Sequence, residues 1–261
     1  MILSKHCWQK VIFLLIASFL AGCGSTQVVS SPSIITATSK TNPTVPSATI
    51  EPQSPADDLS SYAFPDAIDP MKQYLFYLHG KIIEDQGIPA VSADFGEYEY
   101  LEILEKLASH GLVVISEQRS KNTDGVEYAK RVTEQIETLL GAGVAAKNIT
   151  VVGASKGAAI TIYVSHMLGN EQVNYVIMAI CNPDNLDIFK QDEVFLYGNV
   201  LSIYDSTDEL AGSCQELFSC SEVKGLSNYE EIVLHVGTGH GILYKPLDEW
   251  IIPVVKWAGR P

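Results

Sequence analysis

The sequence predicts an α/β fold with a mostly parallel central sheet covered by helices on both faces. Short, almost entirely apolar runs alternate along the chain with longer segments whose apolar residues recur at helical spacing. Strands that are apolar at nearly every position are typical of parallel sheets buried on both faces. The runs that we expect to be strands cover residues 74–79, 111–116, 148–153, 173–181, 200–204 and 231–236.

Four further segments have the apolar spacing of helices. They cover residues 98–110, 124–140, the stretch from the third strand to about residue 168, and 248–258. Asp124 is a candidate N-cap for the second of these helices. Active sites of mostly parallel sheets lie at the carboxyl ends of the strands. The loops that follow the strands are therefore where we expect the catalytic side chains.

Composition limits the classes of function. The chain has 261 residues, 46% of them hydrophobic, which suits one sizeable core rather than two full enzyme domains. Its formal net charge is −14. An acidic surface repels phosphate backbones, so nucleic acid is not expected as a partner. It also repels anionic lipid headgroups, so membrane attachment is expected to need an anchor rather than a basic face.

Residues 1–22 have the pattern of a secretion signal. Lys5 and Lys10 precede an apolar run over residues 11–20, which is too short to span a bilayer. The run ends in Leu-Ala-Gly before Cys23 and resembles the lipobox of bacterial lipoproteins. That resemblance implies cleavage before Cys23, acylation of its thiol with palmitate-type chains, and a lipid anchor on the periplasmic or cell-surface side of the envelope. An ordinary signal peptide with a coincidental cysteine is the alternative.

Cleavage there would change both the charge and the domain organisation. Lys5 and Lys10 are the only charged residues of the signal, so 15 basic and 31 acidic side chains would remain, a net charge of −16. Residues 23–60 are rich in Ser, Thr and Pro and cannot bury enough apolar area to fold. We expect them to form a disordered tether. Residues 61–261 then form the catalytic domain.

Three cysteines follow the tether. Because an exported protein meets an oxidising environment, Cys214 and Cys220 are a candidate disulfide that closes a small loop. Cys181 ends an apolar run and is expected to be a buried thiol. No spacing of Cys and His indicates zinc, and neither a metal nor another cofactor is expected.

A candidate nucleophile lies directly after the third expected strand. The pattern Gly-x-Ser-x-Gly there places Ser155 between Gly153 and Gly157. Between a strand and a helix this pattern forms a sharp turn that holds the serine above the sheet edge. The flanking glycines leave room for a backbone crossing that a side chain would block. A glycine-rich turn without chemistry is the alternative for Ser155.

A serine hydroxyl needs a base to take its proton. Of the six histidines, only His240 lies in a glycine-rich loop between the last strand and the last helix, at the expected catalytic edge. We therefore expect His240 to be the general base. Most lone histidines are structural, so this assignment depends on location.

The base needs a carboxylate to fix its tautomer. The fifth strand leads into Asp205 and Asp208, and Asp208 lies further into the loop, from where it can turn back toward His240. Asp208 is the preferred acid. Asp205 is the alternative and can instead brace the loop by binding backbone amides. Asp184 and Asp187 are more remote options.

The oxyanion of an acyl-transfer reaction needs two N–H donors. One is expected from the backbone of Lys156, directly after the nucleophile. The other is expected from the loop that follows the first strand, where Gly80 permits a tight turn and Lys81 is the favoured donor, with Ile82 as the alternative.

These elements, in the order Ser, Asp, His, resemble the α/β-hydrolase superfamily. The matching parts are the strand that ends in His79-Gly80, the turn around Ser155, the Asp208 loop and the His240 loop, and the resemblance covers residues 70–261. It implies that superfamily's fold and hydrolysis through an acyl-enzyme. Two departures are expected. The first two strands of the family are reduced, and residues 181–200 leave room for one short helix but no lid.

The function expected is therefore a serine hydrolase, foremost a carboxylic-ester hydrolase of the carboxylesterase kind. Its partner would be a small-molecule ester or other acyl substrate. An amidase, peptidase or acyltransferase would use the same three residues. A catalytically silent binding module of the cell envelope is the alternative from another class. The sequence does not identify protein partners.

Overall fold

The computed structural model describes residues 59–260, and its centre is a six-stranded sheet in the order β4-β1-β5-β6-β7-β8. Every neighbouring pair of strands in this sheet is parallel. The strands are β1 (Tyr74–Leu78), β4 (Val113–Ile115), β5 (Ile149–Ala154), β6 (Asn174–Met178), β7 (Asn199–Asp205) and β8 (Asn228–Leu234).

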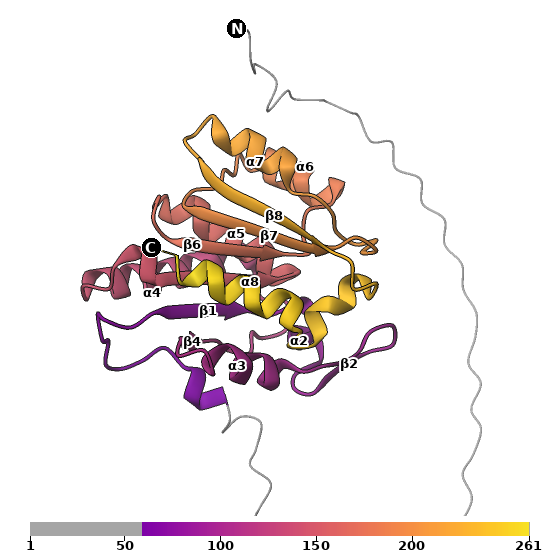
Figure 1. The fold of residues 1–261 in the computed structure, drawn as a ribbon, viewed down its shortest axis with the longest axis horizontal. Helices are drawn as coiled ribbons and strands as arrows, with labels where there is room; N and C mark the ends of the chain where they lie inside the picture. The colour runs from indigo at the N-terminus through magenta and orange to yellow at the C-terminus, as the bar shows by residue number, and fades with distance from the viewer. Residues whose placement is uncertain (1–58, 261) are drawn as a thin grey trace, which may run out of the picture. The chain divides into compact units, whose positions relative to one another are not determined.

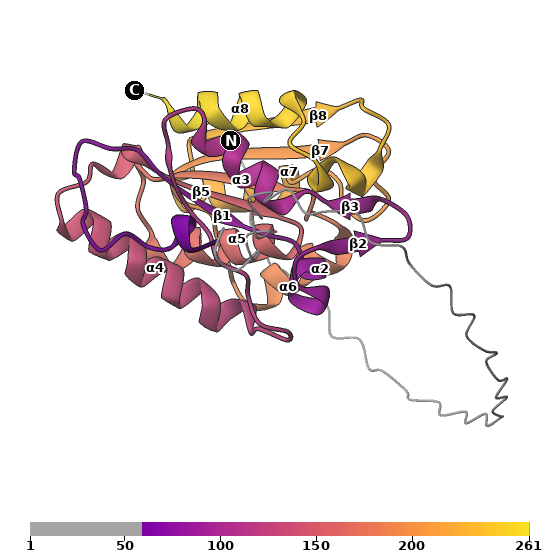
Figure 2. The same ribbon diagram turned by 90° about the horizontal axis from the view of Figure 1, so that it is seen from below.

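Helices cover both faces of the sheet (Figures 1 and 2). One face carries α4 (Gly125–Gly141), α5 (Lys156–Leu168), α6 (Pro183–Gln191) and α7 (Gln215–Glu222). The other carries α3 (Tyr100–Ala108) and α8 (Asp248–Ala258), and Figure 2 shows the sheet between α8 and α4. The predicted fold class is confirmed: a parallel central sheet is covered by helices on both faces, and in the described residues no strand of the main sheet precedes β1.

Alternation along each strand divides the core into two clusters. All five side chains of β1 are buried. Tyr74, Phe76 and Leu78 face α4 and α5, whereas Leu75 and Tyr77 face α3 and α8. A strand that is buried on both faces must be apolar throughout, which explains the continuous apolar run.

The expected strands and helices are all present, with some of their ends shifted. The last strand begins three residues earlier than expected and ends at Leu234. Asp124 caps α4 as expected, because its Oδ1 accepts hydrogen bonds from Val126 N (2.9 Å) and Glu127 N (3.0 Å). The one short helix expected between residues 181 and 200 is α6.

Several short elements were not expected. They are helices α2 (Lys81–Gln86) and α7, the two-stranded hairpin of β2 (Ala90–Ser92) and β3 (Gly96–Tyr98), and the 3₁₀ segments Ser60–Tyr62, Ala146–Asn148 and Gly239–Tyr244. Each is too short for a hydrophobic period to be visible in the sequence.

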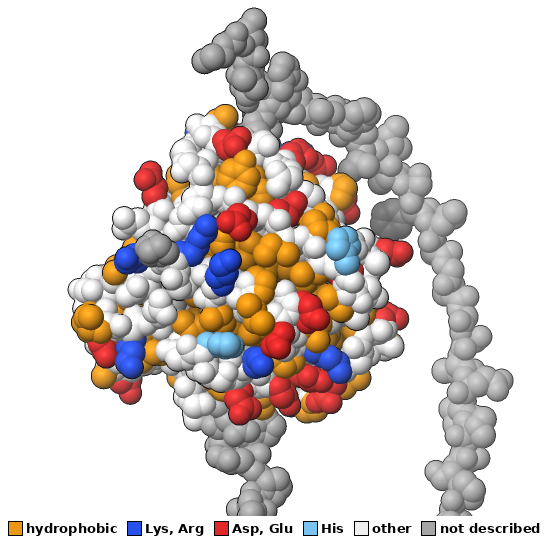
Figure 3. Space-filling model, viewed as in Figure 1, with side chains coloured by type: hydrophobic (Ala, Val, Ile, Leu, Met, Phe, Trp, Pro, Cys, Tyr) orange, Lys and Arg blue, Asp and Glu red, His pale blue; other side chains and the backbone are white. Residues whose placement is uncertain are grey.

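The outer surface is acidic, as the composition requires. In Figure 3, which shows the face with α8 and β8, acidic side chains are spread widely among fewer Lys and Arg side chains. Val233 of the edge strand β8 and Ile252 of α8 are exposed hydrophobic residues. None of the helices in the described range combines the length and apolar character that crossing a bilayer requires. The expected signal, the lipid anchor at Cys23 and all but the last two residues of the tether lie outside the described residues.

The closest backbone approach in this fold yields a prediction. A Cβ added to Gly157 would lie 1.8 Å from Leu78 O, so Gly157→Ala must push α5 away from β1. We expect it to lower the free energy of unfolding by about 3 kcal/mol or more. The matched control is Gly141→Ala at the end of α4, where an added Cβ meets nothing within 4 Å.

Urea denaturation followed by circular dichroism measures both variants. Gly141→Ala is expected to raise the free energy of unfolding by about 0.5–1 kcal/mol, since alanine is the better helix former. A Gly157→Ala protein as stable as the unmodified chain would contradict the close packing described here.

Candidate active site

Ser155 occupies a strained turn between β5 and α5. Its φ of 52° and ψ of −117° are unfavourable for any residue with a Cβ. The turn is held because Ser155 N donates to Met178 O (2.9 Å), which extends the pairing of β5 with β6. The backbone thus places the serine side chain at the carboxyl end of the sheet, at the N-terminus of α5.

The two glycines around Ser155 are required by close backbone contacts. A Cβ on Gly153 would lie 2.3 Å from Gly157 O, and a Cβ on Gly157 would meet the backbone of β1. The Gly-x-Ser-x-Gly pattern therefore has the steric origin that the sequence indicates.

His240 and Asp208 lie together at the same edge of the sheet. His240 Nδ1 is 2.9 Å from Asp208 Oδ2, and the Asp208 side chain is fully buried. The second oxygen of Asp208 accepts from Leu210 N (2.8 Å). Because Asp208 occupies Nδ1, the Nε2 atom of His240 is left for another partner.

Asp205 braces the loop by binding backbone amides, which is the alternative role considered for it. Its Oδ1 accepts hydrogen bonds from Thr207 N and Oγ1, and its Oδ2 accepts from Val236 N (2.8 Å) and Gly237 N (3.0 Å). Burial acts to raise the pKa of Asp205, but these hydrogen bonds outweigh it and hold the pKa below the ordinary value. Asp205 therefore braces the Asp208 loop against the loop before His240.

The expected oxyanion donors lie at the starts of two helices near Ser155. Lys156 is the first residue of α5 and Lys81 the first of α2. N–H groups in the first turn of a helix have no partner within it and point outward from its positive end. Gly80, before Lys81, lies close to the serine: a Cβ built on it would be 3.7 Å from Ser155 Cβ.

Ser155 and His240 open into one cavity of about 520 Å³. Its walls come from the segment after β6 and from the loop after Asp208, and they are lined by Ala179, Ile180, Asn182, Pro183, Asp184, Asn185, Glu209 and Leu210. Within residues 59–260 the Ser155 hydroxyl makes no hydrogen bond to His240; such bonds commonly tighten once a substrate is bound.

The hairpin of β2 and β3 supports the His240 loop. The Phe95 ring lies 6.2 Å from the His240 ring, and a Cβ on Gly241 would lie 3.2 Å from Phe95 Cδ1. This contact could not be predicted from the sequence, because the hairpin itself was not expected.

The disulfide expected between Cys214 and Cys220 is wrong. Cys214 is bonded to Cys181, 33 residues earlier, and Cys181 is therefore not the buried thiol that we expected. Beside it, Gly212 N donates to Cys181 O (2.6 Å), and Asn182 Nδ2 donates to Leu210 O (2.8 Å). The three links join the two walls of the cavity. Spacing in the sequence could not reveal this pair, because it depends on how the loops after β6 and β7 meet.

Three of the other described histidines have different partners or surroundings. His79 is fully buried, His166 Nδ1 accepts from Phe195 N (3.2 Å), and His235 Nδ1 is 2.9 Å from Ser206 Oγ. Among residues 59–260, no three His, Cys, Asp or Glu side chains gather as a metal site would require.

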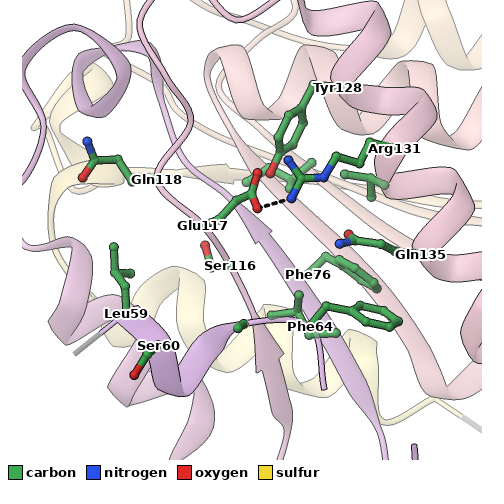
Figure 4. Close-up of a pocket in the computed structure, with 14 residues that line it drawn as sticks. Leu59, Ser60, Phe64, Phe76, Ser116, Glu117, Gln118, Tyr128, Arg131 and Gln135 are labelled. Atoms are coloured by element: carbon green, nitrogen blue, oxygen red, sulfur yellow. Dashed lines mark hydrogen bonds and ion pairs between the residues drawn. The ribbon is translucent and has the colours of Figure 1, made fainter. Parts of the chain in front are cut away.

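A second cavity, of about 360 Å³, lies between α4 and the loop after β4 (Figure 4). Its floor is formed by Phe64 and Phe76, and an ion pair between Glu117 Oε2 and Arg131 (2.5 Å) crosses one side. One of the two serines in its wall, Ser116, has its hydroxyl bonded to Tyr77 O and to the Tyr100 hydroxyl. Neither Ser155 nor His240 lines it, whereas both line the first cavity.

The disulfide gives a prediction that peptide mapping can check. Trypsin cuts after Lys156, Lys190 and Lys224, so Cys181 lies in the peptide 157–190, and in a Cys220→Ser variant Cys214 is the single cysteine of the peptide 191–224. Without reduction, we expect mass spectrometry to find these two peptides joined. Finding 157–190 alone, with a free thiol, would contradict the Cys181–Cys214 bond.

No family profile matches this chain, and no curated protein sequence matches it either. Solved structures are similar to it at low identity. SOBER1 of Arabidopsis thaliana is 13% identical over 72% of this chain and 97% of that one, with a TM-score of 0.49. The Francisella virulence factor BioJ is 12% identical over 76% and 79%, with a TM-score of 0.49.

A third structure is the hyperthermophilic esterase from the archaeon Pyrobaculum calidifontis, 16% identical over 73% of this chain and 74% of that one, with a TM-score of 0.44. Likenesses at this level say nothing about the substrate of this chain. The proposed function therefore depends on the geometry of Ser155, His240 and Asp208.

Proposed function

We propose that this protein is a serine hydrolase, and foremost a carboxylic-ester hydrolase, with Ser155 as nucleophile, His240 as general base and Asp208 as the orienting acid. One observation carries the proposal. A serine in a strained strand-to-helix turn shares a cavity with a histidine whose far ring nitrogen is bonded to a buried carboxylate. Three such groups in one place are what nucleophilic acyl transfer needs.

The reaction follows from this arrangement. Asp208 accepts a hydrogen bond from Nδ1–H of His240 and remains ionised, so Nε2 is free to take the proton of Ser155 as Oγ attacks the acyl carbon. The carbonyl oxygen becomes an oxyanion. Collapse of the tetrahedral intermediate expels the alcohol, which receives the proton from His240. Water, activated by the same histidine, then releases the acid and restores Ser155.

The oxyanion would be bound by the backbone N–H groups of Lys156 and Lys81. Both stand at helix N-termini, where the helix dipole favours negative charge. The cavity has an apolar side at Ala179, Ile180 and Leu210, which suits an acyl chain. The same three residues serve amide hydrolysis and acyl transfer, so the choice among them depends on the substrate that fits this cavity.

The first test is turnover of p-nitrophenyl esters from acetate to laurate. Ser155→Ala is expected to abolish turnover and labelling by a fluorophosphonate probe. Asp208→Asn is expected to lower kcat by about 10³–10⁴-fold, because the neutral amide no longer fixes the His240 tautomer.

Asp205→Asn is the matched control for Asp208→Asn. It is expected to lower stability, because Asp205 braces two loops, while a smaller part of kcat is lost. Equal losses of kcat in the two variants would contradict the assignment of Asp208. No turnover or labelling of the unmodified chain would favour the silent binding module, and labelling without turnover would favour an amidase, a peptidase or an acyltransferase.

We also propose that the protein is exported and held at the cell envelope by lipid at Cys23. The lipobox-like sequence supports this, and a disulfide between Cys181 and Cys214 suits an oxidising compartment. Cys23→Ala is expected to move the full chain from the membrane fraction to the soluble fraction. Retention of that variant on membranes, measured by blotting of fractions, would contradict the anchor.

A further inference from the structure

A fully buried carboxylate lies behind the two expected oxyanion donors. Glu84 belongs to α2, three residues after Lys81, and its side chain has no exposed area. Its Oε1 accepts from Arg119 Nε (2.6 Å), and its Oε2 accepts from Lys156 Nζ (2.5 Å). One carboxylate thus holds two cations from distant parts of the chain.

The first of these cations, Lys156, is next to the proposed nucleophile in the chain. Lys156 directly follows Ser155 and supplies one of the expected N–H donors. Its Nζ also donates to Thr123 O (2.7 Å), in the loop that enters α4. The side chain of Lys156 is therefore fixed at its end by Glu84 and Thr123, and it ties α2 to the start of α5.

The second of these cations, Arg119, contacts His79, two residues before Lys81. Arg119 is fully buried and donates from its NH2 group to His79 O, while its backbone N–H donates to His79 Nε2 (2.9 Å). Nε2 is therefore unprotonated, and Nδ1–H donates to Gly80 O (2.8 Å). Burial and the Arg119 charge hold the pKa of His79 well below its ordinary value, so the ring is neutral.

These contacts contribute little net free energy to folding, because burying each charge removes its hydration. A buried ion pair is often no better for stability than apolar side chains of the same volume. What the pair adds is a fixed distance between two segments. Here the segments are the loop of Lys81 and the turn of Ser155, whose N–H groups must both lie about 2.7–3.1 Å from one oxyanion.

We propose that Glu84 is a positioning residue of the oxyanion hole: its carboxylate, bridging Lys156 and Arg119, sets the distance between the backbone donors of Lys156 and Lys81. This inference rests on the proposed function. Glu84 acts through its two cations and does not touch the substrate. Because misplacement by about 1 Å can cost on the order of 10²-fold in rate, loss of the bridge should act on kcat.

The test replaces Glu84 by Gln, which keeps its shape and removes its charge. We expect kcat for the best p-nitrophenyl ester to fall about 10–100-fold, with KM changed by less than about threefold, because the oxyanion exists only after Oγ attack. Inhibition by a trifluoromethyl ketone, which forms an oxyanion when Ser155 Oγ adds to its carbonyl, should weaken by a similar factor.

The double variant Glu84→Gln/Lys156→Met separates positioning from folding. The Lys156 side chain is partly buried, and Lys156→Met removes one of the two cations that Glu84→Gln leaves without a carboxylate, so it should restore part of the melting temperature lost in Glu84→Gln. The bridge is still absent, so kcat should stay low. Glu230→Gln, which breaks the exposed pair with Arg260, is the control and should change neither quantity.

Each outcome decides one point. A Glu84→Gln enzyme with unchanged kcat and ketone inhibition overturns the inference and leaves the proposed function standing. Recovery of kcat together with the melting temperature in the double variant also overturns it, since Glu84 would then be merely structural. If Ser155→Ala hydrolyses esters as fast as the unmodified chain, the proposed function fails and the inference falls with it.

Discussion

The approach of α5 to β1 is the constraint on which the rest of the site depends. Gly157 lies so close to Leu78 that no side chain fits between them, and the chain can reach this position only through the strained turn at Ser155. The strain is sustained because β5 and β6 pair up to the turn itself. The same approach brings the start of α5 beside the end of β1, where the loop of Gly80 and Lys81 begins. The proposed nucleophile and the proposed oxyanion donors are thus brought together by one backbone contact.

The other half of the site is held by polar contacts between loops. Asp205 links the loops after β7 and β8, Asp208 holds His240, and the Cys181–Cys214 bond ties the Asp208 loop to the wall after β6. Loops make few apolar contacts of their own, so their order has to come from such links. The two acids in one loop have separate tasks, one structural and one directed at the histidine.

The sequence alone predicted those structural features whose pattern lies within a short stretch of the chain. The apolar runs predicted all six strands, and Gly153, Ser155 and Gly157 predicted the turn, because both signals arise within a few residues. The position of His240 followed from its glycine-rich loop. The disulfide and the contacts of Glu84 and Arg119 could not be predicted, because they join segments tens of residues apart. The β2–β3 hairpin and α2 were missed because their pairing and burial come from neighbours rather than from their own periodicity.

The sheet order has a consequence for how the chain folds. All neighbours in the main sheet are parallel, so each pair of strands is separated in sequence by a crossover. Strand β1 meets its first neighbour, β4, about 35 residues later and its second, β5, about 70 residues later. In the described part of the chain, the β2–β3 hairpin alone pairs strands through a short turn. Folding that depends on closing long loops before any sheet forms is slow, with apolar strands exposed meanwhile. The turn at Ser155 needs β1, β5 and β6 together, so it can form only after β5 has paired with both of its neighbours.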